Sequence, residues 1–465
     1  MKRGGTSGGA AGRKGSAREA ALDVLVRVEE DRSYSNLLLN RTLQQYRLER
    51  QDAALATELV YGTIQRLNTI DYYLARFVAK GMDKLQPWVR ALLRLGFYQL
   101  HYLTRIPAHA AVSEAVNIAK KRGHPGISGM VNGVLRNVSR RRAELVLPGD
   151  LPPVRRIALE HSHPEWMVRR WIGQYGEAAC EAMCRANNEP PHTSIRVNRL
   201  RTTRDELIAR LREAGLTAEP SPVAPGGVLV RGGGNMALAP EYGAGLYSVQ
   251  DESSMLVAEW VDPQPGQRVL DCCAAPGGKT AHMAEKMGDR GEIVACDVHE
   301  HKEKLVREQA ERLGLRSIRT VVADARTLQE RFPAASFDRI LLDAPCSGLG
   351  VIRRKPDMKW AKGESEIAAV AEVQRELLEA VHPLLKPGGV LVYSTCTVER
   401  SENEEQIAEF LGRHPEFAPD APQGAAQADK LRLTRPDALG GAAVQILPSD
   451  YGSDGFFIAR LRKRA

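Results

Sequence analysis

The sequence is most constrained at residues 268–280, which read R-V-L-D-C-C-A-A-P-G-G-K-T. Val269 and Leu270 are typical of the end of a buried strand, and the proline and glycines that follow force a tight turn. The residues from Lys279 onward favour the start of a helix. A strand, a turn of small residues and a helix predict a nucleotide-cradling unit, because the helix N-terminus offers free N–H groups to a ligand.

Two better-known glycine-rich turns also connect a strand to a helix. A phosphate-binding P-loop requires a glycine at position 273, and Cys273 stands there, so the P-loop interpretation fails. The dinucleotide fingerprint G-x-G-x-x-G is also absent from the turn. On these residues alone, a glycine-rich turn with a purely structural role remains open.

The chain after the turn predicts a parallel sheet. Further strands are expected at residues 292–297, 317–322, 338–346 and 389–396, with helices at 300–313 and 365–385. Apolar strands that alternate with helices favour an α/β fold with a doubly wound, mostly parallel, Rossmann-like sheet. The functional groups of such a sheet collect at the C-terminal ends of its strands. Those ends carry Asp297, Asp324, Asp343, Cys346 and Cys396.

Two kinds of side chain at these strand ends suggest chemistry. Asp297 ends the second predicted strand, where an acid suits hydrogen bonds to ribose hydroxyls. A single cysteine at a strand end is more often a small core residue, but Cys346 and Cys396 end adjacent strands. A pair of this kind indicates nucleophilic chemistry, since thiolates are favoured near cations and helix N-termini. Ser401 and Glu404 fit a capping box, which predicts a helix that begins near Cys396.

The length and the cysteine usage limit the class of protein. A chain of 465 residues is too long for one ordinary core, so we expect two or three domains. The 7 cysteines include no C-x-x-C pair, which favours a reducing compartment. Cys180 and Cys184 lie one helical turn apart with no matching ligand pair, and we interpret them as buried helix positions. We expect a cytoplasmic monomer with no bound metal and no membrane contact.

The N-terminal third is basic and helical. Residues 1–150 hold 24 Lys and Arg against 13 Asp and Glu, a net charge of +11, whereas the remaining residues are close to neutral. Apolar residues recur with helical periodicity over residues 17–143, which predicts an all-α domain behind a disordered basic tail, residues 1–16. The charge favours contact with nucleic acid, and a solvated basic face is the alternative.

A proline-rich linker, residues 147–153, leads into a smaller module. After a helical stretch at 154–187, strands are expected at 194–200, 227–231 and 245–250, with a helix at 203–214. Thr203 and Glu206 predict a capping box at the start of that helix. This small α+β module is either an RNA-binding sheet or a brace for the catalytic domain, and the residues leave both alternatives open.

Three motifs resemble those of one enzyme family. D-C-C-A-A-P-G-G-K, D-A-P-C-S-G-L-G and Y-S-T-C-T are similar to motifs of the Sun-type RNA cytosine-C5 methyltransferases, as are V-Q-D-E-S-S and R-R-K-P-D. In the N-terminal third, R-I-P-A-H-A-A-V and N-G-V-L-R-N resemble the NusB-like RNA-binding domain of bacterial members. The resemblance implies four parts: the tail 1–16, a NusB-like domain 17–145, the linker and module 146–245, and a methyltransferase domain 246–465.

The resemblance also implies a cofactor and a substrate. The methyl donor would be S-adenosylmethionine, and the substrate would be 16S ribosomal RNA or a small-subunit assembly intermediate. The turn would cradle the cofactor through Cys273, Ala274, Ala275, Pro276, Gly277, Gly278 and Lys279. Asp297 would bind the ribose, Asp324 would lie beside the adenine, and Asp343 would lie between cofactor and cytosine.

The catalytic residues implied by the resemblance are Cys396, Cys346, Asp343 and Lys279. Cys396 would attack C6 of the cytosine, and Cys346 would assist elimination and release. The opposite assignment, with Cys346 as the nucleophile as in DNA cytosine methyltransferases, cannot be separated by spacing. A ribosome-assembly factor without enzymatic activity is an alternative from another class, although both cysteines are intact.

Overall fold

The structure, a computed structural model, describes residues 15–31, 35–422 and 439–465. The chain divides into two compact units, one with residues up to Asn188 together with Lys355–Ala361, and one with Glu189–Arg354 and Lys362–Ala465. The predicted basic tail falls outside the described residues up to position 14. The four-part division implied by the resemblance remains a prediction.

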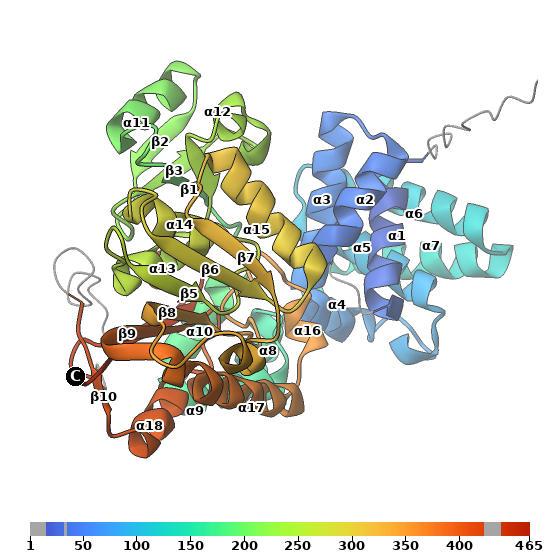
Figure 1. Ribbon diagram of the computed structural model, residues 1–465. Helices are drawn as coiled ribbons and strands as arrows, with labels where there is room; N and C mark the ends of the chain where they lie inside the picture. The colour runs from blue at the N-terminus through green and yellow to red at the C-terminus, as the bar shows by residue number, and fades with distance from the viewer. Residues whose placement is uncertain (1–14, 32–34, 423–438) are drawn as a thin grey trace, which may run out of the picture. The chain divides into compact units, whose positions relative to one another are not determined.

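The first unit is built from helices, as the sequence predicts (Figure 1). Their order is α1 Ala17–Asp31, α2 Ser35–Tyr46, α3 Arg50–Gln65, α4 Leu67–Leu74, α5 Pro87–Tyr102, α6 Ala108–Arg122, α7 Pro125–Arg140, α8 Pro153–Glu160, α9 Glu165–Tyr175 and α10 Glu177–Ala186. Prolines occupy the first turn of α5 and α7, where the missing N–H costs nothing. No helix among the described residues is long and apolar enough to span a membrane.

Helix α5 lies at the centre of this unit because it is apolar on nearly every side. Leu92, Leu93 and Phe97 on α5 are almost fully buried and pack with residues of α1, α3 and α7. Gly96 allows close packing, since a Cβ there would lie 2.7 Å from the side chain of Leu135 on α7. Cys180 and Cys184 on α10 are fully buried, which confirms that they are core positions.

The short segment Lys355–Ala361 belongs to the helical unit although it is distant from it in sequence. It ends in α16 (Met358–Ala361), where the Lys359 ammonium is fully buried. Lys359 Nζ donates to three oxygens of the same unit: Ser162 O at 2.8 Å, Gln65 O at 2.9 Å and Asn188 Oδ1 at 3.1 Å. Burial lowers the pKa of Lys359 well below its usual value.

The second unit contains a small antiparallel sheet with the order β2-β3-β1-β4. Its strands are β1 Thr193–Val197, β2 Thr217–Pro220, β3 Gly227–Arg231 and β4 Tyr247–Val249, and α11 (Arg204–Glu213) packs on one face through Leu207 and Leu211. The predicted capping box at α11 is confirmed, since Thr203 and Glu206 bond each other's backbone N–H. Strand β2 is additional to the strands that the sequence predicts.

The larger sheet has the order β10-β12-β9-β8-β5-β6-β7. Its parallel strands are β5 Arg268–Asp271, β6 Glu292–Asp297, β7 Ile318–Val322, β8 Phe337–Asp343 and β9 Leu385–Thr395. The connections reverse direction at β5, because β6 lies on one side of it and β8 on the other. Such a switch point leaves a crevice at the C-terminal strand ends, where α/β proteins bind their ligands.

Helices cover both faces of this sheet, which confirms the predicted doubly wound fold. Val269 and Leu341 face one layer, formed by α13 (Glu252–Val261), α14 (Gly278–Lys286) and α15 (Glu300–Leu313). Leu270 and Leu342 face the other layer, formed by α17 (Glu364–Val381) and α18 (Glu404–Arg413). Because successive side chains of a strand point to opposite faces, neighbouring residues such as Val269 and Leu270 are both apolar.

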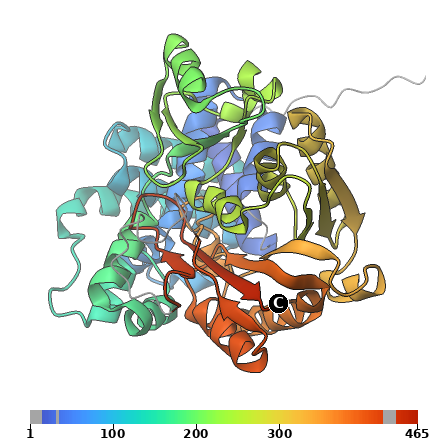
Figure 2. The ribbon, with the colours of Figure 1, turned by 60° about the vertical axis from the view of Figure 1, so that its left-hand side comes forward.

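Two features of the C-terminal part differ from the expectations. The sheet continues beyond β9 with antiparallel strands, β12 (Phe456–Lys463) beside β9, and β10 (Phe417–Pro419) and β11 (Ala443–Ile446) beside β12 (Figure 2). The capping box predicted from Ser401 and Glu404 is wrong. Helix α18 starts at Glu404 after Asn403 without a side-chain cap, and the Asn403 amide instead bonds Thr395 Oγ1 and Thr397 O.

Candidate active site

The turn after β5 is shaped by one glycine. Gly277 has φ of +99°, and a Cβ there would approach Val306 Cα of α15 to 3.0 Å. Both the left-handed backbone and the close approach require glycine. The adjacent Gly278 begins α14, whose first N–H groups face the same crevice end of β5. The turn can therefore bring backbone close to a ligand, as the sequence predicts.

Asp271 lies at the base of this turn, and the sequence motifs alone did not assign it to the site. Thr280 Oγ1 donates to its Oδ2 at 2.6 Å, while its Oδ1 is buried with no hydrogen-bond partner among the described residues. Burial and the nearby Asp343 charge raise the pKa of Asp271 to about 7. Its position directly before the glycine-rich turn is the sequence signal that could have identified it.

Asp297 and Asp324 follow β6 and β7 at the same edge of the sheet. Asp297 is 7% exposed, and its Oδ2 accepts from the Ala275 N–H of the turn at 3.3 Å. Asp324 has a different environment, because its Oδ2 accepts from the Arg326 guanidinium at 2.7 Å. That hydrogen bond lowers the pKa of Asp324. The two acids are thus brought to one edge, with Asp297 directly beside the turn.

Asp343 and Lys279 form an ion pair at the end of β8. Lys279 Nζ donates to Asp343 Oδ2 at 2.7 Å, and Ser394 Oγ donates to Asp343 Oδ1 at 2.8 Å. Burial acts to lower the pKa of Lys279, but the charge and hydrogen bond of Asp343 raise it overall. The ammonium therefore stays charged beside the cysteine that follows β9.

The two predicted catalytic cysteines meet at this point. Cys346 Sγ and Cys396 Sγ lie 3.4 Å apart, within hydrogen-bond distance for sulfur, although 50 residues separate them in the chain. The hydrogen bond with Cys396, together with burial, raises the pKa of the Cys346 thiol well above its usual value. Cys346 is therefore a protonated thiol in this geometry.

A buried carboxylate joins the loops that carry the cysteines. Glu402 Oε2 accepts from Ser347 N at 2.8 Å and from Gln374 Nε2 at 3.0 Å. Thr397 Oγ1 lies 2.8 Å from Ser347 Oγ and links the same loops directly. These contacts involve neighbours of both cysteines, so they hold the separation between the two sulfur atoms.

A cavity of about 410 Å³ opens beside Cys396. Its lining includes Lys279 of α14, Cys396 after β9, Phe456 of β12, and Ser194 and Gln250 in or next to the small sheet, all within the second unit. Cys396 therefore borders space that a planar base could enter.

An ion-pair network forms another wall of this cavity. Arg354 donates to Asp454 at 2.8 Å and to Asp251 at 2.8 Å. Burial and the neighbouring Asp251 raise the pKa of Asp454 to about 7. In the sequence, Arg354 and Asp251 stand out only as members of motifs, and Asp454 was missed because it belongs to no motif.

The comparison with known proteins agrees with this geometry. Family models match three segments: "16S rRNA methyltransferase RsmB/F" at residues 258–462, the NusB family at 15–140, and an RsmF/B-like ferredoxin-like domain at 163–237. A "probable ribosomal RNA small subunit methyltransferase B" of Bacillus subtilis is 47% identical over 97% of this chain and 100% of the relative. The chain belongs to the RsmB/F family of 16S rRNA methyltransferases.

Other relatives extend the likeness to fold and length. A protein of the same description from Synechocystis is 37% identical over 96% of this chain and 99% of its own. The crystal structure of PH0851 superposes with a TM-score of 0.80 at 28% identity, over 97% of this chain and 100% of the other. A methyltransferase homologue from Pyrococcus horikoshii gives a TM-score of 0.59 at 31% identity, over 67% and 99%. The likeness to these relatives therefore extends over nearly the whole chain.

Proposed function

We propose that the protein methylates C5 of a cytosine in 16S ribosomal RNA with S-adenosylmethionine, through a covalent bond between Cys396 and C6. The observation that carries the proposal is the pair of sulfur atoms 3.4 Å apart beside the Lys279–Asp343 ion pair. C5 of cytosine is a poor nucleophile until an adduct at C6 breaks the aromaticity of the ring. A nucleophilic cysteine beside an acid and a second thiol supplies groups suited to that chemistry.

The turn offers groups that fit S-adenosylmethionine. The buried Asp271 Oδ1, which has no partner among the described residues, is an acceptor suited to a ligand cation or donor, and Gly277 leaves the backbone accessible. Asp297 would bind the ribose hydroxyls, Asp324 would lie beside the adenine, and residues Cys273–Gly278 would line the cofactor. When bound, the cofactor supplies the electrophilic methyl group.

The residues of this chain would then handle the cytosine. The Cys396 thiolate adds to C6, and the electron pair of the C5–C6 double bond becomes available at C5, which takes the methyl group. Lys279 lies close enough to Cys396 for their charges to interact, which favours the thiolate. Asp343, fixed by Lys279 and Ser394, would contact the base edge. The base must leave its stack to reach this cavity.

Elimination completes the reaction. The proton on C5 leaves to a base, the electron pair re-forms the C5–C6 bond, and the Sγ–C6 bond breaks to release Cys396. Cys346 would assist release, because its protonated thiol lies 3.4 Å from Cys396 Sγ and can donate a hydrogen bond to the departing thiolate. Cys396 lines this cavity. Cys346, the alternative nucleophile, is not among the described residues that line it.

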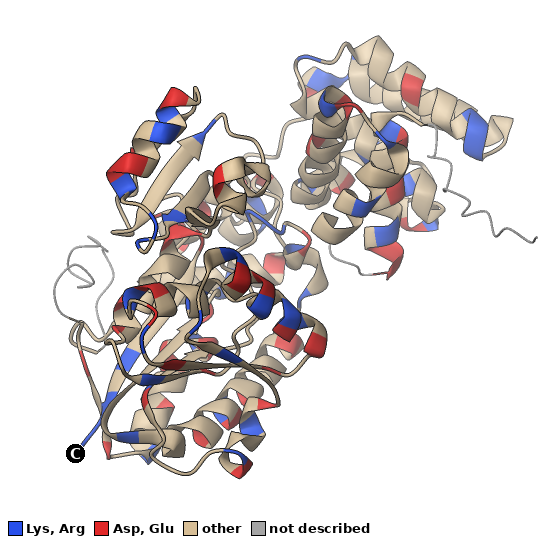
Figure 3. Cartoon of the chain, turned by 45° about the horizontal axis from the view of Figure 1, so that its top comes forward, with Lys and Arg blue, Asp and Glu red and all other residues tan. Residues whose placement is uncertain are grey.

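The helical unit would bind RNA. Many of its cations are paired, for example Arg94 with Asp71 and Arg122 with Asp23, and acidic and basic residues are interspersed on its helices (Figure 3). The exposed Arg136 and Arg140 on α7 instead bond the neutral oxygens Asn132 Oδ1 and Arg136 O. The end of α7 is therefore the part of this unit that we expect to contact phosphate groups.

Bisulfite sequencing of 16S ribosomal RNA tests the proposed function. RNA from cells with the wild-type protein should contain a protected cytosine that is absent from cells without it or with Cys396→Ala. An unchanged set of protected cytosines in cells that lack the protein would contradict cytosine-C5 methylation of this RNA.

A further inference from the structure

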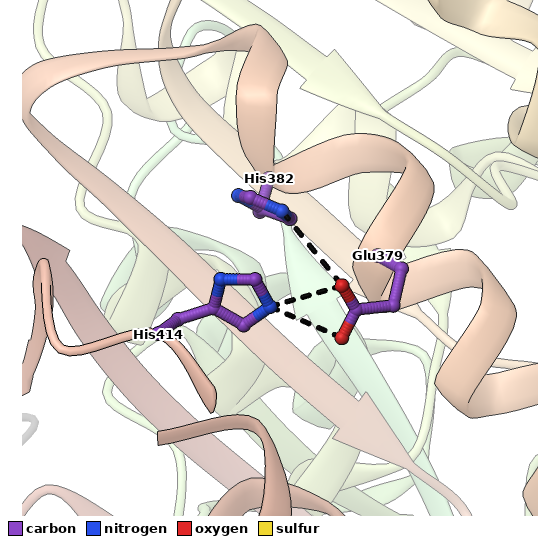
Figure 4. Close-up of side chains that lie close together, drawn as sticks. All are labelled: Glu379, His382 and His414. Atoms are coloured by element: carbon purple, nitrogen blue, oxygen red, sulfur yellow. Dashed lines mark hydrogen bonds and ion pairs between the residues drawn. The ribbon is translucent and has the colours of Figure 1, made fainter. Parts of the chain in front are cut away.

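Three side chains that can bind a metal gather away from the methyl-transfer site, near the C-terminal ends of α17 and α18 (Figure 4). Glu379 lies near the end of α17, and His382 begins the 3-10 turn η5 (His382–Leu384). Their spacing of three residues places both side chains on one face. His414 follows α18, and Glu416 precedes β10.

Both imidazole rings have Nε2 directed toward Glu379. His414 Nε2 lies 2.9 Å from Glu379 Oε2, and His382 Nε2 lies 3.9 Å from the same oxygen. One ligand atom from each of these residues lies within 4.8 Å of the others. A tetrahedral zinc ion with bonds of about 2.0–2.2 Å separates its ligands by roughly 3.3 Å. The three ligands need only small side-chain adjustments to reach that spacing.

Glu416 lies on the Nδ1 side of the two rings. Its Oε1 lies 3.2 Å from His414 Nδ1 and 4.0 Å from His382 Nδ1. A carboxylate that accepts from Nδ1–H leaves the Nε2 lone pair free for a metal and fixes the orientation of the ring. The His414 ring thus has Nδ1 bonded to Glu416 and Nε2 toward Glu379, which is the arrangement of a carboxylate–histidine–metal site, whereas His382 Nδ1 lies beyond hydrogen-bond distance of Glu416.

The surroundings of the cluster also suit a metal ion. The histidine rings are 15% and 14% exposed and pack against Phe410 and Phe417, which form an apolar shell. Glu379 is 37% exposed, so an ion can enter and a water can complete its coordination. Arg413 lies 3.1 Å from Glu379 Oε1, and this contact leaves Oε2 as the ligand atom.

A second cluster of similar composition lacks these properties. Glu160, His161 and Glu181 in the helical unit also lie close together. The Arg156 guanidinium lies 3.0 Å from Glu160 and 2.8 Å from Glu181, so one cation pairs with both carboxylates, whereas Arg413 lies against Oε1 of Glu379 and the two rings approach Oε2. This cluster therefore serves as an internal comparison rather than as a candidate site.

We propose that Glu379, His382 and His414 bind a divalent cation of the zinc type, with Glu416 orienting the His414 ring. This inference departs from the expectation of a protein without metal, and it does not depend on the proposed methyl transfer. The ion would join the C-terminal ends of α17 and α18, whereas the bond from Gln406 Nε2 to Ala371 O links the two helices elsewhere along their length. The site is therefore structural and should raise the stability of the C-terminal half.

Metal titration of the tag-free, full-length protein tests the proposal. The protein is stripped with a chelator and titrated with Zn²⁺ against a chromophoric competitor, and with Co²⁺ for its absorption spectrum. Because Cys346 and Cys396 form a competing thiol pair, all variants carry Cys346→Ala and Cys396→Ala. In this background we expect one bound Zn²⁺, a Co²⁺ spectrum without thiolate bands, and a higher melting temperature with metal.

Three substitutions test which residues bind the ion. His414→Gln should weaken Zn²⁺ binding by more than about 100-fold, and Glu416→Gln should weaken it by about 10–100-fold. His124→Gln, at an exposed histidine of the helical unit, is the matched control and should leave the affinity unchanged. Circular dichroism verifies that each variant is folded. Absence of Zn²⁺ binding in the Cys346→Ala and Cys396→Ala background would overturn the proposal. So would folded His414→Gln and Glu416→Gln variants that bind Zn²⁺ as tightly as that background.

Discussion

Replacement of Gly350 by alanine should displace the loops that carry the two cysteines. Gly350 N donates to Cys396 O at 3.0 Å, and Gly350 O accepts from Gly455 N at 2.8 Å. A Cβ at this position would meet the Gly455 carbonyl oxygen and would lie 2.8 Å from Cys396 O. Both obstacles are backbone atoms, which cannot rotate aside as a flexible side chain can. The backbone beside Cys396 must therefore move.

The expected losses of stability and activity follow from the clash with backbone atoms. Overpacking a dense interior costs about 1–3 kcal/mol, and contact with backbone on two sides favours the upper end of that range. A displacement of about 1 Å at a reacting group can cost about 100-fold in rate. We therefore expect Gly350→Ala to lose roughly 2–3 kcal/mol of unfolding free energy and at least about 100-fold in kcat.

Denaturant unfolding and methyl incorporation at saturating substrates measure the two effects. Gly412→Ala is the matched control, because Gly412 lies in α18 and a Cβ there would meet nothing within 4 Å. An alanine in a helix is favoured over glycine by about 0.5–1 kcal/mol, so the control should be neutral or slightly more stable. Wild-type stability and kcat in Gly350→Ala would refute the inferred coupling between this loop and Cys396.

Three further experiments test separate parts of the protein. Asp297→Ala should weaken S-adenosylmethionine binding by about 1–3 kcal/mol, because its polar partners lose their acceptor, and unchanged affinity by calorimetry would remove Asp297 from the site. The double change Arg136→Glu and Arg140→Glu should weaken RNA binding in filter assays, with a smaller loss at high salt; an effect independent of salt would argue against phosphate contacts. Asp454 has a pKa of about 7 against an ordinary 3.8, so its contribution to stability is full below about pH 4 and is lost as pH rises through about 7. Asp454→Asn should flatten that fall in unfolding free energy, and a slope equal to that of the wild type would contradict the assignment.

The parallel strands and the strand-end residues could be predicted because local pattern and topology agree. Val269 and Leu270 are both apolar because each face of the sheet is covered, and this pattern distinguishes a parallel strand from an exposed one. The acids and cysteines that follow such strands must then meet at one edge. For this reason Cys346 and Cys396 could be paired in advance, although their roles came from the family resemblance.

The features that the sequence did not predict depend on contacts between residues distant in sequence. Strand β12 contains charged residues that suggest an exposed segment, yet Arg460 is buried with its Nε bonded to Asp420 Oδ2 at 2.9 Å. Lys359 likewise suggests a surface residue, but three oxygens of the helical unit surround its ammonium. Asp454 is held in the site by Arg354 and Asp251, which lie 100 and 203 residues earlier. None of these partners can be identified from local periodicity or charge.

The central claim is that Cys396 forms the bond to cytosine and Cys346 assists its release. The most direct test is denaturing electrophoresis of radiolabelled 16S RNA with cofactor and the variants Cys346→Ala, Cys396→Ala and both together. Cys346→Ala can still attack C6 but should fail to eliminate, so we predict a protein–RNA band that survives denaturation. Cys396→Ala and the double variant should give no such band. A trapped band in Cys396→Ala, with none in Cys346→Ala, would contradict the assignment and make Cys346 the nucleophile.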